Sequence, residues 1–537
     1  MGAQATGEGR KIALVGGLLL AATLATKAAG YIGKVLIARR FGTGGDYDAY
    51  VLAFTVPDIL LFLVIGGAVS SAFVPVTTER LAKDLPEEAV RVVNGVMTAA
   101  FLILGGAILV LEILAPLIVG ALAHNLPPEG QALAINITRI LLIQALFLGL
   151  GGFATGVMIA YRRFVPYALA PFFYDLAIIF AALFLTQLPA GGGRLGVIGL
   201  ALGVALGGVL HLGVQVPSLW RIGWRPVVPR ALKDPAVWRV ARLTVPISIG
   251  LIAIQANVAI DRYLASSLPA GRVSALDFAN EIAQIPNLTF TTALVVVMFP
   301  YFARDAALGQ LDSLRRRAAL AVRLNLFVLI PAAVGLVVLG PQLVALLLQR
   351  GAFDANSTSL VAASLALFAV GIAGQASIFL VVRVYYSLQQ VITPMLIALA
   401  SVVVNVACTL VFLGPLGAAG LALATSIAST FNFVLLVWFV RRRIGGFEGR
   451  QMALMLAKVS AGCVALAVVA YGTWVLLAGD GPVRLDIRHY LALGLAILLA
   501  TAAYLGVQFA LRSSEAGVAI GVFLRRRSAV EPVEGVA

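Results

Sequence analysis

The stretch from Thr26 to Pro75, TKAAGYIGKVLIARRFGTGGDYDAYVLAFTVPDILLFLVIGGAVSSAFVP, decides the fold of this chain. It predicts two membrane helices joined by a short glycine-rich turn. The first helix carries Lys27 and Lys34, which project from almost the same face, roughly 10 Å apart along the axis. A cation inside a membrane costs about 2.5–3.5 kcal/mol on insertion scales. We therefore expect both lysines to face water or an anion; the alternative is that they snorkel to an interface.

The composition indicates an all-α integral membrane protein. Hydrophobic residues make up 61% of the chain and charged residues 12%, and the mean hydropathy is +1.01. Continuous apolar runs of about 20 residues favour helices, because the strands of a membrane barrel alternate apolar and polar residues. The net charge of +15 comes mostly from loops, so we interpret it as a topology signal and expect no nucleic-acid partner. The cysteines and histidines show no disulfide or metal-ligand spacing.

We predict about fourteen membrane spans. Their ranges are 12–38, 49–75, 90–117, 132–160, 165–187, 195–217, 236–266, 274–302, 318–340, 358–388, 392–413, 416–440, 452–478 and 489–511. Loops after even-numbered spans are richer in Lys and Arg, which places both termini in the cytoplasm, although Arg39 and Arg40 lie at an outer end. All loops are short, so we expect no soluble catalytic domain and no enzyme activity.

A weak internal repeat links the second and eighth spans, which carry AYVLAFTVPDIL and ALDFANEIAQIPNL. Each copy has a proline inside the helix, Pro57 or Pro286, and these prolines are candidate hinges. The copies predict two pseudo-symmetric lobes of about six helices, related by an axis along the membrane normal, with a substrate path between them. The predicted divisions are an N-lobe at 1–230, a C-lobe at 231–445, two C-terminal helices at 446–511 and a cytoplasmic tail at 512–537. Chance similarity between apolar segments is the alternative.

Polar residues inside the spans are candidates for function, because such residues are costly in a membrane. Glu281 and Gln284 share a helix face at three-residue spacing. Asp58 and Asp175 either serve the substrate path or form structural ion pairs with Arg139 or a lysine.

A carboxylate and three neutral oxygen donors form a candidate sodium site, since hard cations prefer oxygen ligands. The residues are Asp261, Ser401, Asn405 and Thr425. The alternative is interhelical hydrogen bonding by small polar residues. Asp261 and its neighbour Arg262 also lie near the outer end of their span, where an interfacial position is the alternative.

Several longer motifs are spread along the chain. They include ARRFGTGGDYDAYVLAF at 38–54, AYRRFVPYALAP at 160–171, LLLQRGAFDANST at 346–358, YYSLQQVITP at 385–394 and GPLGAAGLALATS at 414–426. Through them the chain resembles the MurJ (MviN) family, lipid II flippases of the multidrug/oligosaccharidyl-lipid/polysaccharide exporter superfamily. The resemblance implies fourteen helices in two lobes. It also implies an undecaprenyl-pyrophosphate-linked peptidoglycan precursor as substrate, moved from the inner to the outer leaflet of the bacterial cytoplasmic membrane.

The resemblance also carries over to single residues. It implies that Lys27 takes the place of a cavity arginine, with Thr26 in place of a serine beside it, and that Asp48 matches the family's aspartate. It places Asp261, Ser401, Asn405 and Thr425 at or near sodium positions proposed in some members.

The chain departs from the family pattern at other cavity positions. Gly33, Phe62 and Glu281 stand where further arginines are usual, and Gly66 replaces an acidic residue. Arginine forks suit pyrophosphate, so either another cation supplies the missing charge or the substrate differs. The candidate cations are Lys34, Arg139 and Arg262. Glu281 is further a candidate to pair with Lys27 or Lys34 when no substrate is bound.

The leading prediction is a lipid II flippase that works by alternating access. It needs no cofactor beyond coupling to sodium or the membrane potential, and it acts as a monomer in the bilayer. The alternatives are a flippase for another polyprenyl-linked oligosaccharide and a cation-coupled multidrug exporter, which would favour an acidic, aromatic cavity. A membrane-embedded glycosyltransferase would need a catalytic carboxylate on a sizeable outer loop, and the outer loops here are short.

Overall fold

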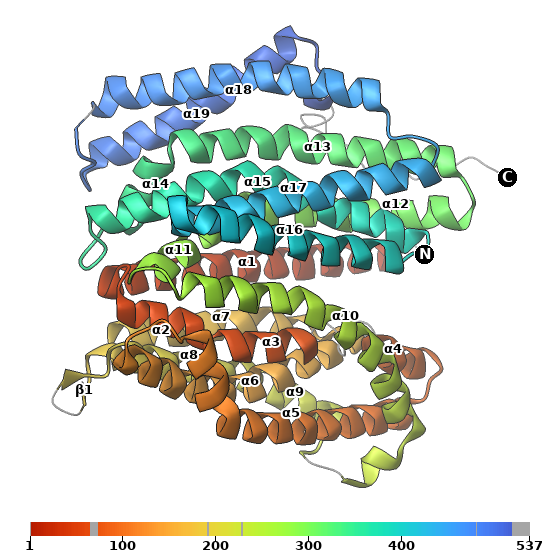
Figure 1. Cartoon of the computed structure of the whole chain (residues 1–537). Coiled ribbons are helices and arrows are strands. Elements are labelled where there is room, and N and C mark those ends of the chain that lie inside the picture. Colours follow the sequence, from red (N-terminus) through yellow and green to blue (C-terminus); the bar gives the residue numbers. More distant parts are fainter. Residues whose placement is uncertain (1, 65–72, 191–192, 227–228, 480, 518–537) are drawn as a thin grey trace. The chain divides into compact units, whose positions relative to one another are not determined.

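The computed structural model describes residues 2–64, 73–190, 193–226, 229–479 and 481–517, and nearly all of them are helical (Figure 1). Within these residues, ten helices are long and apolar enough to cross a membrane. They lie at 86–122, 128–160, 164–187, 196–222, 311–338, 355–387, 392–416, 418–443, 449–478 and 487–510. The predicted all-α membrane class is confirmed, and the total of fourteen spans stays a prediction.

The chain divides into two compact units. Unit 1 runs to Ser274 and also includes Arg350–Asp354; unit 2 contains Ala275–Gln349 and the chain from Ala355 onward. The predicted N-lobe ends at residue 230, whereas unit 1 continues to Ser274 and so includes the helix after residue 230. The C-terminal helices group with unit 2. The two lobes that the internal repeat predicts stay a prediction.

Unit 1 is a bundle of helices, and its described residues also include a pair of two-residue antiparallel strands. Its helices are α1 (Gly2–Phe41), α2 (Gly45–Ala53), α3 (Thr55–Val64), α4 (Val74–Ala82), α5 (Pro86–Leu122), α6 (Pro128–Ala160), α7 (Phe164–Leu183), α8 (Gly196–Gly213), α9 (Val216–Ile222) and α10 (Pro235–Ala265). Short 3-10 turns lie at Leu185–Gln187 and Pro229–Lys233, and β1 (Pro189–Ala190) pairs antiparallel with β2 (Gly193–Arg194).

Unit 2 begins inside α11 (Arg272–Pro286) and continues through a π-helical turn (Asn287–Thr291). Its other helices are α12 (Thr292–Ala307), α13 (Leu311–Val338), α14 (Gly340–Leu348), α15 (Ala355–Ser387), α16 (Ile392–Leu416), α17 (Ala418–Arg443), α18 (Gly449–Ala478) and α19 (Ile487–Ala510). The helices α15 and α17 pack closely because Gly371 has no side chain: a Cβ there would lie 2.5 Å from Cα of Ser426. Small residues allow such close approach in membranes.

The second predicted span is interrupted. It forms α2 and α3, which meet at Phe54, and its last part lies outside the described residues. Pro57 has no N–H to donate to the carbonyl of Ala53, four residues earlier. The hydroxyl of Thr138 on α6 donates to that carbonyl oxygen instead, at 3.2 Å. The proline therefore opens the helix where a neighbouring helix satisfies the released acceptor.

The eighth predicted span is also irregular, because the π-helical turn separates α11 from α12 directly after Pro286. A polar network fixes this turn to its neighbours. Thr291 Oγ1 donates to Asn325 Oδ1 on α13 at 2.9 Å, and Asn325 Nδ2 donates to Ser377 Oγ on α15 at 3.1 Å. Such turns occur often at functional sites. The hinge roles of both prolines stay predictions.

The loop Arg350–Asp354 belongs to unit 1 because it is held against the end of α1. The amide of Ala352 donates to the carbonyl oxygen of Arg39 at 2.9 Å. Gly351 has a φ of +61°, and a Cβ there would lie 2.4 Å from the same carbonyl oxygen. The glycine of the QRGAF sequence is thus required by both the backbone conformation and the close contact.

The start of α19 is capped by Asp486, whose Oδ1 accepts from the amide of His489 at 2.9 Å and lies 2.5 Å from its Nδ1. These hydrogen bonds, the backbone one first, lower the pKa of Asp486. Their stabilising effect is present above the ordinary pKa of aspartate and is lost as pH falls through the lowered folded-state pKa.

We expect Asp486→Ala to lower the midpoint of thermal unfolding by roughly 1–2 °C, because the amide loses its acceptor. Asp486→Asn keeps a cap and serves as the control. The measurement is thermal unfolding in detergent at pH 7. Equal midpoints for the alanine variant and the wild type would contradict the capping role.

Candidate functional site

The predicted substrate residues of unit 1 lie on four helices. Lys27 on α1 is exposed, and Lys34, two turns further along, is half-buried. Thr26 is also half-buried and donates its hydroxyl to the carbonyl oxygen of Ala22 at 2.9 Å. The helix α1 packs against α7 within this unit.

Gly30 lies between the two lysines on the same face of α1, since it follows Lys27 by three residues and precedes Lys34 by four. A Cβ at Gly30 would lie 3.3 Å from Oδ2 of Asp175 on α7. The carboxylate of Asp175 therefore packs against the lysine-bearing face. This face combines two cations with one adjacent anion, an arrangement that suits an exchangeable anionic ligand.

Asp48 holds the start of α11. Its carboxylate accepts hydrogen bonds from the amide of Gly271 at 2.5 Å, the amide of Ser274 at 2.7 Å, and the hydroxyl of Ser274. The side chain is 1% exposed. A carboxylate that accepts from the free amides of a helix N-terminus stabilises that end. The geometry gives Asp48 a structural role, and its predicted contact with substrate stays a prediction.

The turn that Asp48 holds depends on a glycine. Gly271 has a φ of +88°, and a Cβ there would lie 2.4 Å from the carbonyl oxygen of Thr43. The turn before α2 and the turn before α11 therefore touch through their backbones.

Two further candidate cations each have an acidic partner within unit 1. Arg262 on α10 lies 3.4 Å from Oδ2 of Asp58 on α3 and donates to Thr55 Oγ1 at 3.1 Å. Arg139 on α6 lies 3.7 Å from Oε2 of Glu112 on α5. The sequence predicts Arg139 or a lysine as possible partners of Asp58; the arginine that lies beside it is Arg262. Each pair is close to neutral overall, so neither arginine adds much net positive charge.

In unit 2, the predicted polar face of α11 connects to α15. Glu281 is exposed, whereas Gln284 is half-buried. Gln284 Nε2 donates to Gln375 Oε1 on α15 at 3.3 Å, and its Oε1 accepts from Asn287 Nδ2 at 2.9 Å. This chain of amides places hydrogen-bonding groups beside the π-helical turn.

The neutral members of the candidate sodium site lie on α16 and α17, which pack together. Ser401 and Thr425 donate their hydroxyls to the carbonyl oxygens of Ala398 and Leu421 at 2.7 and 3.0 Å. Ser401 Oγ also accepts from Asn432 Nδ2 at 3.0 Å, and Asn405 Oδ1 accepts from Thr409 Oγ1 at 3.1 Å. Because the hydroxyl hydrogens point into the helices, oxygen lone pairs remain, and this donor chemistry fits a hard cation.

The carboxylate member of that site, Asp261, lies in unit 1, where its Oδ2 accepts from Asn257 Nδ2 at 3.4 Å. Across the described ranges, no group of three or more His, Cys, Asp and Glu side chains is arranged to hold a metal ion.

Arg383 on α15 is a cation for which the sequence indicated no role. Its guanidinium lies 5.5 Å from the centroid of the Phe299 ring and 5.7 Å from that of Tyr386. The contact with Tyr386 could be predicted from the sequence, because this residue lies one turn along the same helix. The contact with Phe299 on α12 could not, because the sequence does not show which helices are neighbours. Aromatic faces hold a cation without neutralising it, so Arg383 is a further cation inside unit 2.

Comparison with known proteins places this geometry in context. A family model described as lipid II flippase MurJ matches residues 37–485. The lipid II flippase MurJ of Burkholderia cenocepacia is 31% identical over 433 residues, which cover 78% of this chain and 82% of that protein. A probable lipid II flippase MurJ of Rhizobium tropici is 28% identical over 526 residues, or 97% of each chain.

Solved structures share the fold. A lipid II flippase MurJ in an inward closed conformation matches with a TM-score of 0.75 at 22% identity, covering 95% of this chain and 100% of that one. An inward-facing multidrug resistance MATE family transporter matches with a TM-score of 0.65 at 13% identity, covering 78% and 94%. The family model and the relatives together show that this chain belongs to the lipid II flippase MurJ family.

Proposed function

We propose that this protein moves lipid II, the lipid-linked peptidoglycan precursor, from the inner to the outer leaflet of the bacterial inner membrane. Membership of the family supports the substrate class. The observation that carries the proposal is the face of α1 on which Lys27 and Lys34 lie beside a carboxylate. A membrane helix retains such cations at a cost, and an anionic headgroup that must cross the membrane explains why.

The lysine face binds the pyrophosphate of the substrate. Lysine binds phosphate as a point charge, whereas arginine binds it through a planar fork. Asp175 partly neutralises the lysines in the empty state, and phosphate replaces that interaction when substrate arrives. The polyprenyl chain stays in the bilayer throughout, because transferring it into water would expose a large apolar surface.

The transport step is alternating access between inward-open and outward-open states. Pro57 and Pro286 are the hinges, supported by the break at Phe54 and by the π-helical turn, where the regular hydrogen-bond pattern changes. The membrane potential biases the step, since moving one charge through 100 mV is worth about 2.3 kcal/mol.

We further propose that sodium is the coupling ion, held by Ser401, Asn405 and Thr425 of unit 2; the role of Asp261 stays a prediction. The support is the oxygen-only donor set on two packed helices. A bound sodium ion supplies one positive charge. The protein works as a monomer. Both termini lie in the cytoplasm, and the support for this orientation is the excess of Lys and Arg in the loops that follow the even-numbered spans.

The proposed function predicts rescue of bacteria depleted of their own lipid II flippase by this chain. Purified protein in vesicles should also make lipid II accessible in the opposite leaflet, and faster with a sodium gradient than with a potassium gradient. A parallel assay uses a polyprenyl-pyrophosphate oligosaccharide with a different glycan. Transport of that lipid without transport of lipid II would favour the alternative flippase. Export of cationic drugs without lipid transport would favour an exporter.

A further inference from the structure

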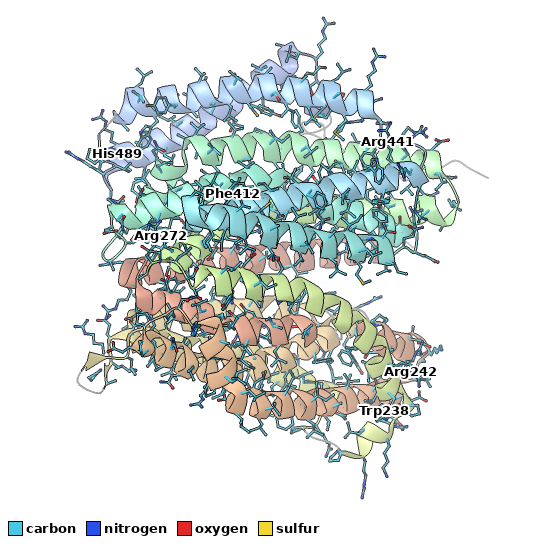
Figure 2. The ribbon with its side chains drawn as sticks, viewed as in Figure 1. Trp238, Arg242, Arg272, Phe412, Arg441 and His489 are labelled. Carbon is cyan, nitrogen blue, oxygen red and sulfur yellow. The ribbon has the colours of Figure 1, made fainter. Side chains whose placement is uncertain are left out.

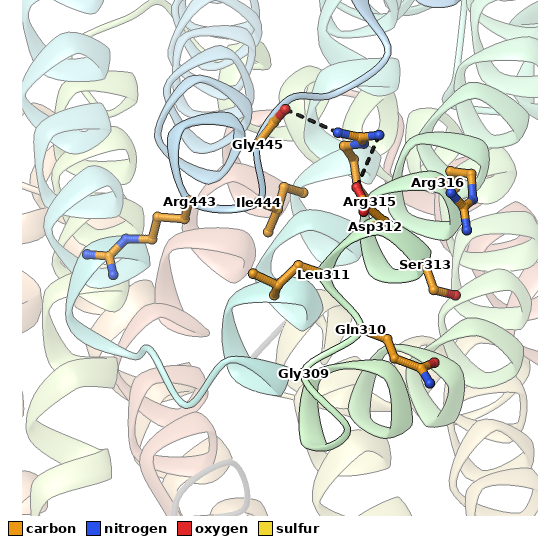
Figure 3. Close-up of a pocket in the computed structure, with 10 residues that line it drawn as sticks. All are labelled: Gly309, Gln310, Leu311, Asp312, Ser313, Arg315, Arg316, Arg443, Ile444 and Gly445. Atoms are coloured by element: carbon orange, nitrogen blue, oxygen red, sulfur yellow. Dashed lines mark hydrogen bonds and ion pairs between the residues drawn. The ribbon is translucent and has the colours of Figure 1, made fainter.

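A pocket of about 740 Å³ lies at one end of unit 2 (Figure 3). Its walls come from two segments: the turn before α13 with the first turn of that helix, residues 309–316, and the end of α17, residues 443–445. The volume falls in the range typical of small-ligand sites, about 300–1,000 Å³.

The pocket is positively charged. Its lining contains Arg315, Arg316 and Arg443 but a single acidic residue, Asp312. Arg315 spans the two segments: its Nη1 donates to the carbonyl oxygen of Gly445, and its Nη2 lies near Oδ1 of Asp312, both at 3.3 Å. The Nε of Arg315 is buried and has no hydrogen-bond partner within the described part of the chain. A buried donor of this kind favours an incoming acceptor.

The other two arginines are exposed and extend to opposite sides of the pocket (Figure 3). Between them lie Leu311, whose side chain is 42% exposed, and the buried Ile444. The pocket therefore combines an apolar middle with exposed cationic side chains on either side. A small hydrophilic anion needs no apolar middle, whereas the headgroup end of a phospholipid presents both a phosphate and an acyl chain.

The pocket is formed where two candidate membrane spans end, which is where lipid headgroups are expected. It joins the ends of two candidate membrane spans, Leu311–Val338 and Ala418–Arg443. The guanidinium of Arg442 stacks over the Trp438 ring at 3.7 Å, and tryptophan is typical of the membrane interface. Figure 2 shows Arg441 at this end of the unit and His489 at the opposite end. The concentration of arginines at this end is typical of a cytoplasmic surface.

We propose that this pocket binds the phosphate headgroup of an anionic phospholipid from the inner leaflet. Arg315 forms the fixed wall, Arg316 and Arg443 close on the phosphate from either side, and Leu311 contacts the start of an acyl chain. Basic pockets between helices on the cytoplasmic side of a membrane bind acidic headgroups in this way. All residues of this pocket belong to unit 2, and none of them is among the predicted substrate residues.

The test is thermal unfolding of the full chain in detergent, titrated with phosphatidylglycerol and, separately, with uncharged phosphatidylcholine. The variant is the pair Arg316→Gln and Arg443→Gln, whose side chains are exposed. The matched control is Arg441→Gln with Arg450→Gln, which removes the same charge from exposed residues outside the pocket. A third protein, with Arg316→Lys and Arg443→Lys, keeps the charge.

We expect phosphatidylglycerol, but not phosphatidylcholine, to raise the midpoint of the wild type. The apparent affinity should fall about thirtyfold in the pocket pair and less than about threefold in the control pair, and the lysine pair should recover most of it. Equal losses in the pocket and control pairs would show a diffuse charge effect and overturn the proposal. Binding of glycerol 3-phosphate as tight as that of the lipid would assign the pocket to a soluble ligand instead.

Discussion

Replacing Lys27 by alanine is expected to slow lipid II flipping by about 10–100-fold while leaving the fold intact, because a hydrogen bond to a charged group is worth about 1.5–3 kcal/mol. Lys27 is exposed on α1, so its removal leaves no packing cavity. The lost interaction is the one between the ammonium group and the pyrophosphate. The measurement is the rate at which labelled lipid II becomes accessible in the outer leaflet of vesicles.

Two controls separate a role in binding from a general effect of charge. Lys27→Arg keeps the cation and should retain most of the flipping rate. Lys233→Ala removes an exposed lysine from the 3-10 turn Pro229–Lys233 and should change nothing. An unchanged rate in Lys27→Ala, with Lys34 intact, would remove α1 from the proposed substrate path.

Replacing Asp48 by alanine is expected to lower the free energy of unfolding by about 3 kcal/mol, because buried donors lose a charged acceptor. The amides of Gly271 and Ser274 would both be left without it. Asp48→Asn should cost nearly as much, since its NH₂ group would face amide donors over part of the site. Flipping should fall in both variants because the start of α11 is released. Thermal and denaturant unfolding measure the loss.

Asp46→Ala is the matched control for Asp48, since Asp46 is exposed on the same helix two residues earlier. A role in substrate contact alone would give a different result. In that case Asp48→Ala would slow flipping without changing stability, and the capping role described above would be wrong.

The class of fold was predictable, whereas the partners of most polar residues were not. Long apolar runs indicate membrane helices by themselves, because the hydrocarbon thickness fixes their length. The acceptor role of Asp48 depends on an amide 223 residues away. A single sequence contains no signal for such a contact. Asp48 was therefore predicted to bind substrate.

The ion pairs show the same limit. Asp58 has Arg262 as a partner, which the sequence did not indicate, and Arg139 pairs with Glu112. The predicted role of Asp58 in the substrate path stays a prediction. Helix periodicity says which residues share a face, and it does not say which helices are neighbours. The shared face of the two α1 lysines was easier to predict, because it follows from their spacing on one helix and does not depend on which helices are neighbours.

The breaks in the second and eighth spans were predictable only in part. The prolines marked the places, but the interruption at Phe54 also needs an outside donor, Thr138, for the released carbonyl of Ala53. The π-helical turn is likewise tied to another helix, because the hydroxyl of Thr291 donates to Asn325. Where a helix opens thus depends on what its neighbours offer.

The π-helical turn at Asn287–Thr291 also sets the rotational phase of the helix that follows. A wide turn holds one residue more than an α-helical turn, and one residue corresponds to about 100° of rotation. Removing one amino acid here would let α11 and α12 join as one continuous α-helix and would rotate the Phe299 ring away from the guanidinium of Arg383. The surplus residue therefore determines which side chains of α12 meet α15.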